Sequence, residues 1–130
     1  MSCVLKVGGA ELDVHGLSEV LLAAPYRGKE KWSPISPLDR RNSDGWSVHL
    51  DVSNAVEFDR QIEDAVRFLT ENESSLREAR VFPGVQFAEL DFLIKTRDVA
   101  VQTDTLPPRL LKLAGALDIA LSVSRYERAG

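Results

Sequence analysis

Apolar and polar residues alternate without interruption between Trp46 and Val52. The apolar positions are Trp46, Val48, Leu50 and Val52, and the polar positions between them are Ser47, His49 and Asp51. A period of two is typical of a β-strand that buries one face and exposes the other to water. The run from Ala88 to Ile94 has the same period, so it predicts a second half-buried strand.

Both ends of the sequence repeat this pattern. Cys3 to Val7 alternates until Gly8 and Gly9 stop it, and Asp118 to Tyr126 alternates near the other end. Because each predicted strand has one apolar and one polar face, helices are expected on one side of the sheet only. The sequence therefore predicts one α+β domain over residues 1–130, a two-layer sandwich of the ferredoxin-like class with a mainly antiparallel sheet and helices on one face.

Helical spacing predicts one long helix and two shorter ones. Asn54 and Glu57 form a capping-box pattern before the long amphipathic segment that ends near Glu71. Asp13 is placed to cap an earlier helix that ends before Pro25.

The segment after the second half-buried strand contains a polar turn and a further helix. Lys95 to Asp98 reads as a turn, after which Val99 to Gln102 is predicted to return antiparallel as the second strand of a hairpin. Thr105 is expected to cap the next helix, and Gly115 is expected to end it.

Composition narrows the classes of function. The chain has 130 residues, 44% of them hydrophobic, with a formal charge of −4 and a pI near 5.2. This balance makes nucleic acid an unlikely partner and gives no attraction to an anionic membrane, whereas a basic protein surface fits it. We expect a cytoplasmic protein, because no apolar run is long enough for a signal peptide or membrane span and Cys3 is the single cysteine.

The stretch from Tyr26 to Gly45 has no sustained period and reads as a long irregular connection, with a short strand at Lys29 to Trp32. It carries cations and an aromatic residue suited to phosphates, carboxylates or bases: Arg27, Lys29, Trp32, Arg40 and Arg41. Acidic residues dilute this cluster, so a solvated loop and a binding element both remain interpretations of it.

The polar face of the predicted sheet supplies the second group of candidates. His49 and Asp51 share one face of their strand, and Glu89 and Asp91 join them if the two strands are neighbours. These side chains could reach one small ligand or substrate, although His49 and Asp51 supply two metal ligands rather than three. A solvated outer sheet face explains the same alternation.

The motifs of established chemistries are missing from the sequence. It contains no Gly-x-Ser-x-Gly, and Cys3 falls on the core side of its strand. The Gly8-Gly9 pair lacks both the ending of a P-loop and a complete dinucleotide fingerprint. We therefore assign no catalytic residue, metal or cofactor.

Several short segments resemble a bacterial domain-of-unknown-function family, number four-two-seven-nine. They are Gly8–Asp13, the helix leading to Pro25, Arg27–Lys29, Gly45–Val48, the long helix, the hairpin, and Leu110–Ala114 followed by the Asp118–Ile119 strand. The resemblance covers nearly the whole chain, although the Pro-rich stretch from Trp32 to Leu38 departs from the pattern. It implies a fold and a bacterial origin, and it brings no activity or catalytic residue.

Together these observations predict a non-catalytic cytoplasmic protein-binding module, immunity-type or regulatory, that binds a basic protein surface. The alternative is a small-ligand sensor or enzyme that uses His49, Asp51 and Glu89 on the open sheet face. The chain is expected to be a monomer or a homodimer, with the open face or an edge strand near Cys3 as the pairing surface.

Overall fold

The computed structural model describes residues 2–22, 32–35 and 46–127. The elements in these residues are β1 (Cys3–Gly9), α1 (Val14–Leu22), β2 (Trp32–Ile35), β3 (Trp46–Ser53), α2 (Phe58–Glu71), α3 (Glu73–Arg80), β4 (Phe87–Lys95), α4 (Pro108–Ala116) and β5 (Ala120–Tyr126). Within these ranges, no helix is both long enough and apolar enough to cross a bilayer.

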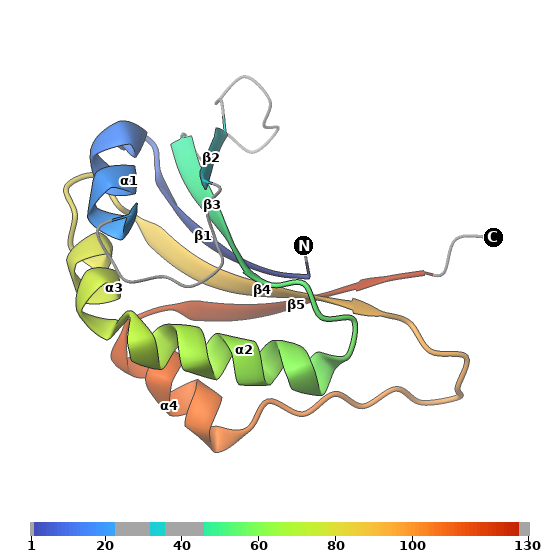
Figure 1. The fold of residues 1–130 in the computed structure, drawn as a ribbon. Coiled ribbons are helices and arrows are strands. Elements are labelled where there is room, and N and C mark those ends of the chain that lie inside the picture. The colour runs from blue at the N-terminus through green and yellow to red at the C-terminus, as the bar shows by residue number, and fades with distance from the viewer. Residues whose placement is uncertain (1, 23–31, 36–45, 128–130) are drawn as a thin grey trace.

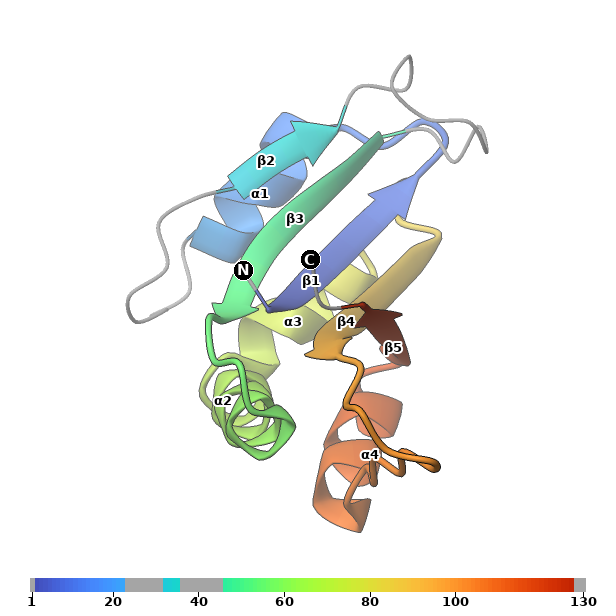
Figure 2. The ribbon, with the colours of Figure 1, turned by 90° about the vertical axis from the view of Figure 1, so that its right-hand side faces the viewer.

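The strands form a five-stranded sheet in the order β2-β3-β1-β4-β5. All neighbouring pairs are antiparallel except β4 and β5, which are parallel. Since β1 and β2 are both antiparallel to β3, they run parallel to each other with β3 between them, which is a split βαβ arrangement. Figures 1 and 2 show the helices on one side of this sheet, so the predicted two-layer α+β class is confirmed.

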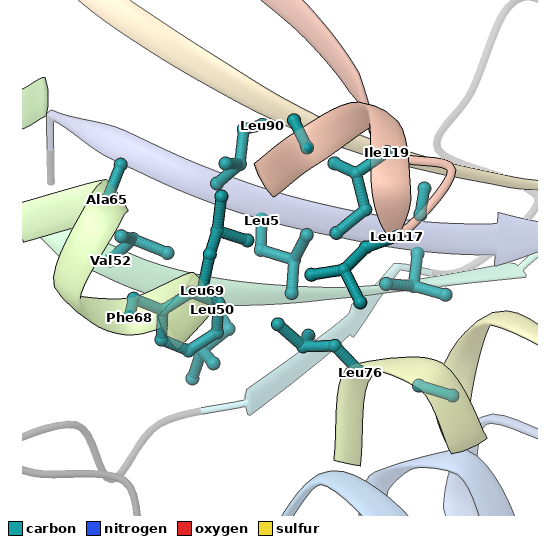
Figure 3. Packing of buried hydrophobic residues seen from close by; sticks show 14 of the residues in the cluster. Leu5, Leu50, Val52, Ala65, Phe68, Leu69, Leu76, Leu90, Leu117 and Ile119 are labelled. Atoms are coloured by element: carbon teal, nitrogen blue, oxygen red, sulfur yellow. The ribbon is translucent and has the colours of Figure 1, made fainter. Parts of the chain in front are cut away.

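The core lies between the sheet and the helices. Leu5 is paired with Leu50 on one side and Leu90 on the other, and Leu69 of α2 packs with these three side chains (Figure 3). Phe58 at the start of α2 meets Phe92 of β4 edge to face, with ring centroids 5.6 Å apart. The helical period of α2 therefore places its apolar stripe against the apolar face of the sheet.

The predicted cap of α1 is confirmed, and the capping box before α2 is wrong. The Asp13 carboxylate accepts a hydrogen bond from the Gly16 amide at 3.2 Å. At α2 the N-cap residue is Glu57, and its side chain makes no capping bond. Gln61, in the first turn of the helix, instead donates its side-chain amide to the Ala55 carbonyl at 3.0 Å. This bond holds the segment that leads into α2.

Helix α4 begins later and ends later than expected. Its N-cap is Pro107 rather than Thr105, and Gly115 lies inside its last turn. The left-handed residue after the helix is Asp118, with φ of 59°. Arg80 holds this residue, because its guanidinium donates to the Asp118 carbonyl at 2.9 Å and pairs with the carboxylate at 3.2 Å. The backbone itself ends the helix, because the Asp118 amide donates to the Gly115 carbonyl at 3.1 Å and the Ile119 amide donates to the Ala114 carbonyl at 2.9 Å. Asp118 rather than Gly115 therefore holds the left-handed position of this cap.

The predicted hairpin strand at Val99 to Gln102 is wrong, because this segment is a loop and β4 pairs with β5 instead. Val99 and Val101 are exposed, so their alternation does not reflect a buried strand face. The edge position predicted for the Cys3 strand is also wrong, since β1 lies between β3 and β4. The short strand near Trp32 runs from Trp32 to Ile35, and Lys29 lies outside the described residues.

Candidate functional site

Strand register brings the candidate residues of the open sheet face into two adjacent rows. In one row Lys6 of β1 lies between His49 of β3 and Glu89 of β4. In the next row Val4 of β1 lies between Asp51 and Asp91. The two candidates on β3 and the two on β4 therefore share the face that the helices leave open, and β1 lies between the two pairs.

Asp91 is the best-anchored residue of this face. Its carboxylate accepts a hydrogen bond from Lys6 Nζ at 3.0 Å and another from Ser124 Oγ of β5 at 2.8 Å. The Asp91 side chain is only 11% exposed, whereas the Lys6 side chain is 30% exposed. A nearly buried carboxylate needs such partners, because an unpaired one is strongly destabilising. Asp91 thus joins β1, β4 and β5 and serves as a structural anchor.

Glu89 differs from Asp91 in its surroundings. It is half-buried, and among the described residues it has no hydrogen-bond or ion-pair partner. Its cross-strand neighbour Lys6 is already bound to Asp91. The Glu89 carboxylate can therefore pair with a positively charged group beyond the described residues.

His49 is half-buried, and its Nε2 lies 3.3 Å from the Ser47 hydroxyl. Burial lowers the pKa of His49, the charge of Lys6 lowers it further, and the charge of Asp91 opposes both effects. The ring is therefore neutral at pH 7, and either nitrogen can carry its proton. His49 adds a neutral polar group to the face rather than a positive charge.

The register does not gather His49, Asp51 and Glu89 around one point. His49 and Glu89 are separated by the whole of β1, which places their strands on the order of 10 Å apart. In the part of the chain that the structure describes, no three His, Cys, Asp or Glu residues are grouped to hold a metal ion. The ligand-site alternative thus gains no specific support from this geometry.

The predicted basic cluster falls largely outside the described residues. Arg27, Lys29, Arg40 and Arg41 lie there, and of this group the structure places only the backbone of Trp32. Trp32 opens β2, where it is paired with Leu50 of β3.

Cys3 is buried in the core, as expected from its strand position. Burial raises the pKa of its thiol, and the nearby charges of Asp91 and Asp64 raise it further. The thiol therefore stays protonated at neutral pH, and the absence of an accessible thiolate agrees with a packing role.

A second ionic group, in the loop over residues 96–107, was not anticipated from the sequence. Asp104 is 5% exposed at its side chain, and it pairs with Arg97 at 3.4 Å and Arg125 at 3.6 Å. The Gln102 side chain donates to the Asp104 carboxylate at 3.0 Å and accepts from the Arg97 amide at 2.8 Å. The hydrogen bond from Gln102 lowers the pKa of Asp104, the charges of Arg97 and Arg125 act in the same direction, and desolvation opposes them.

Two hollows lie away from the open sheet face. A groove of about 490 Å³ between α2 and α4 has Ile62 and Val66 in its lining and Arg67 and Arg109 among its charged residues. A hollow of about 540 Å³ lies where the start of α2, the end of β4 and the loop 96–107 meet. Neither hollow is lined by the candidates of the open face.

Sequence reasoning missed two members of the open face, Lys6 and Ser124. Lys6 had a signal, since it is the one charged residue in the first alternating strand and points to its polar side. Ser124 had none, because its meeting with Asp91 depends on β5 pairing beside β4.

No protein-family model, curated protein or solved structure matches this chain. The resemblance to family number four-two-seven-nine stays a prediction.

Proposed function

We propose that this chain is a non-catalytic protein-binding module whose open sheet face engages a basic surface of another protein. The observation that carries the proposal is the position of Glu89: a half-buried carboxylate without a partner among the described residues, beside a lysine already bound elsewhere. Asp51 and Asp91 lie on the same face, one row away. Lys6 and Lys95 share this face, so its three carboxylates leave it a small net negative charge, which suits a positively charged partner.

The face is also rigid, which favours binding. Its central strands β1, β3 and β4 are hydrogen-bonded to neighbours on both sides. Asp91 is fixed by Lys6 and Ser124, and Val4 is buried between the acidic residues. A surface that is already ordered loses little conformational entropy on binding, so more of the interaction energy contributes to affinity.

The small size of the chain and its pI near 5.2 fit an immunity-type or regulatory protein of the bacterial cytoplasm. An immunity protein neutralises a toxin by covering the basic surface with which the toxin acts. The same electrostatic attraction would speed the encounter of the two proteins and would weaken as salt is added.

The first experiment is affinity purification of the tagged chain from its own organism, followed by mass spectrometry and a binding titration with the purified partner. Glu89→Lys should weaken this binding at least about tenfold, because it places like charges across the interface. Glu78→Lys is the matched control, since Glu78 is exposed on α3 at the helix side and changes the net charge equally. Equal binding by both variants, or purification without a stoichiometric protein partner, would overturn the proposal.

A further inference from the structure

The two edges of the sheet are protected to different degrees. The edge strand β2 has four residues and contains Pro34, which cannot donate a backbone hydrogen bond. The edge strand β5 has seven residues, Ala120–Tyr126, and no proline. β5 is the last strand on its side of the sheet, next to β4 in Figure 2, and no described strand pairs with its outer edge. A long edge of this kind is a surface on which another strand can pair.

The hydrogen bonds of β5 show which of its backbone groups point outward. The Thr96 amide donates to the Tyr126 carbonyl at 2.8 Å, so the backbone of Tyr126 faces β4. In a strand the N–H and C=O of one residue point to the same side, and successive residues alternate. Leu121, Val123 and Arg125 therefore direct their N–H and C=O groups away from the sheet.

We propose that the chain forms a symmetric dimer in which β5 pairs antiparallel with β5 of a second copy, centred on Val123. This register pairs all seven residues of the strand and places Val123 opposite Val123 of the second copy. Leu121 then lies opposite Arg125, so no like charges face each other. A register centred on Arg125 would oppose two arginines, which disfavours it.

The helix layer also supports pairing with a second copy of the chain. Leu111 of α4 is 47% exposed, whereas Arg109, two residues earlier, lines the groove toward α2. Two residues correspond to a rotation of about 200° around a helix, so Leu111 faces away from α2 and toward the β5 side. Leu121 and Val123 are partly buried on the helix side of β5. In the dimer the two α4 helices lie next to each other beneath the joined strands and cover Leu111.

This dimer goes beyond the proposed function and is independent of it. Glu89 lies on the open face of β4, and β5 contributes its outer edge. Glu89→Lys is therefore expected to weaken partner binding while the dimer mass, twice the 14.4 kDa of the chain, stays unchanged.

Disulfide cross-linking tests the register directly. In the Val123-centred pairing, Ala120 and Tyr126 of opposite copies form a non-hydrogen-bonded pair with Cα atoms about 4.5 Å apart, within the range for a disulfide. Mixing Ala120→Cys with Tyr126→Cys should give a disulfide-linked dimer on mild oxidation. Either variant alone should not cross-link, since its own copies lie about 20 Å apart. The native Cys3 is buried and is not expected to form a disulfide with the introduced cysteines.

Val123→Pro tests the pairing without changing the bonds to β4, because the Val123 amide points outward. The dimer dissociation constant measured by analytical ultracentrifugation should rise at least about tenfold, since each copy loses a hydrogen bond to the other. Far-UV circular dichroism and the melting temperature of the monomer should be preserved. Ser122→Pro is the contrasting variant, because its amide faces β4 and its loss should destabilise the fold.

The proposal is overturned if the wild-type chain is monomeric at about 100 µM by light scattering. It is also overturned if a dimer exists but Val123→Pro leaves its affinity unchanged, or if each cysteine variant cross-links alone as well as the mixture does. The last outcome would place the contact elsewhere in the molecule. The cross-linking result does not depend on the proline variant folding, so the register is tested in either case.

Discussion

Asp91 and Asp104 are both carboxylates with little exposed side chain, 11% and 5% respectively, yet they hold together different kinds of structure. Asp91 links β1 and β5 across the sheet through Lys6 and Ser124. Asp104 binds Arg97 within the loop 96–107 and Arg125 of β5. A buried carboxylate on its own therefore does not indicate a functional site, and its partners decide its role.

Removing Asp91 should produce the largest change in stability. Asp91→Ala leaves Lys6 and Ser124 without their acceptor, so the free energy of unfolding is expected to fall by about 2–3 kcal/mol. Asp91→Asn keeps the shape and an acceptor for Ser124 and should cost about 1 kcal/mol. Urea denaturation measures both. If Asp91→Ala were as stable as the wild type, Asp91 would not be the anchor of the open face.

Removing Asp104 should act locally. Asp104→Ala is expected to lower the free energy of unfolding by about 1 kcal/mol, because exposed arginines recover water when they lose their partner. Amide hydrogen exchange should increase over residues 97–103 and stay unchanged in the sheet. Asp98→Ala, in the same loop and exposed, is the control and should change neither. Faster exchange throughout β1 and β4 would contradict the distinction between the two groups.

Protonation of Asp104 at acidic pH should weaken the contacts that hold the loop 96–107. Because the folded-state pKa of Asp104 lies below its ordinary value, its contribution to stability is complete above the unfolded pKa, about 4, and is lost as pH falls through the folded pKa. Amide exchange in the loop measured across this acidic range should rise, and Asp104→Asn should remove that titration. A wild-type loop whose exchange followed the variant at every pH would contradict this assignment.

The smallest expected effect concerns His49. Its folded-state pKa is lowered by burial and by Lys6, so the unfolded chain binds the proton more tightly. Stability is therefore full above the unfolded pKa of about 6.5 and falls as pH decreases toward the folded pKa. His49→Gln should flatten the pH dependence of the melting temperature between about pH 7 and pH 5. Identical slopes for the two proteins would show that His49 does not titrate differently on folding.

Much of this fold was predictable because the periods of strands and helices appear as patterns of apolar residues within short stretches of the sequence. The alternation at Trp46 to Val52 located β3, and the helical spacing that follows located α2. The placement of His49 and Asp51 on the polar face followed from the same alternation. The failed hairpin at Val99 to Gln102 shows the limit, since two valines at period two were exposed in a loop held by Gln102.

The contacts of the candidate site could not be read in this way. Lys6 and Asp91 are 85 residues apart in the chain, and Asp91 and Ser124 are 33 apart, so each contact depends on which strands become neighbours. The outward edge of β5 likewise exists only because β5 pairs parallel to β4 instead of a returning hairpin strand. Local periodicity thus set the kinds of element and their buried faces, because side-chain direction repeats along a helix or strand. Strand order set the partners of Asp91, the position of Glu89 beside a lysine bound elsewhere, and the place of β5 as the last described strand of the sheet. These features depend on long-range packing, which a local pattern does not contain.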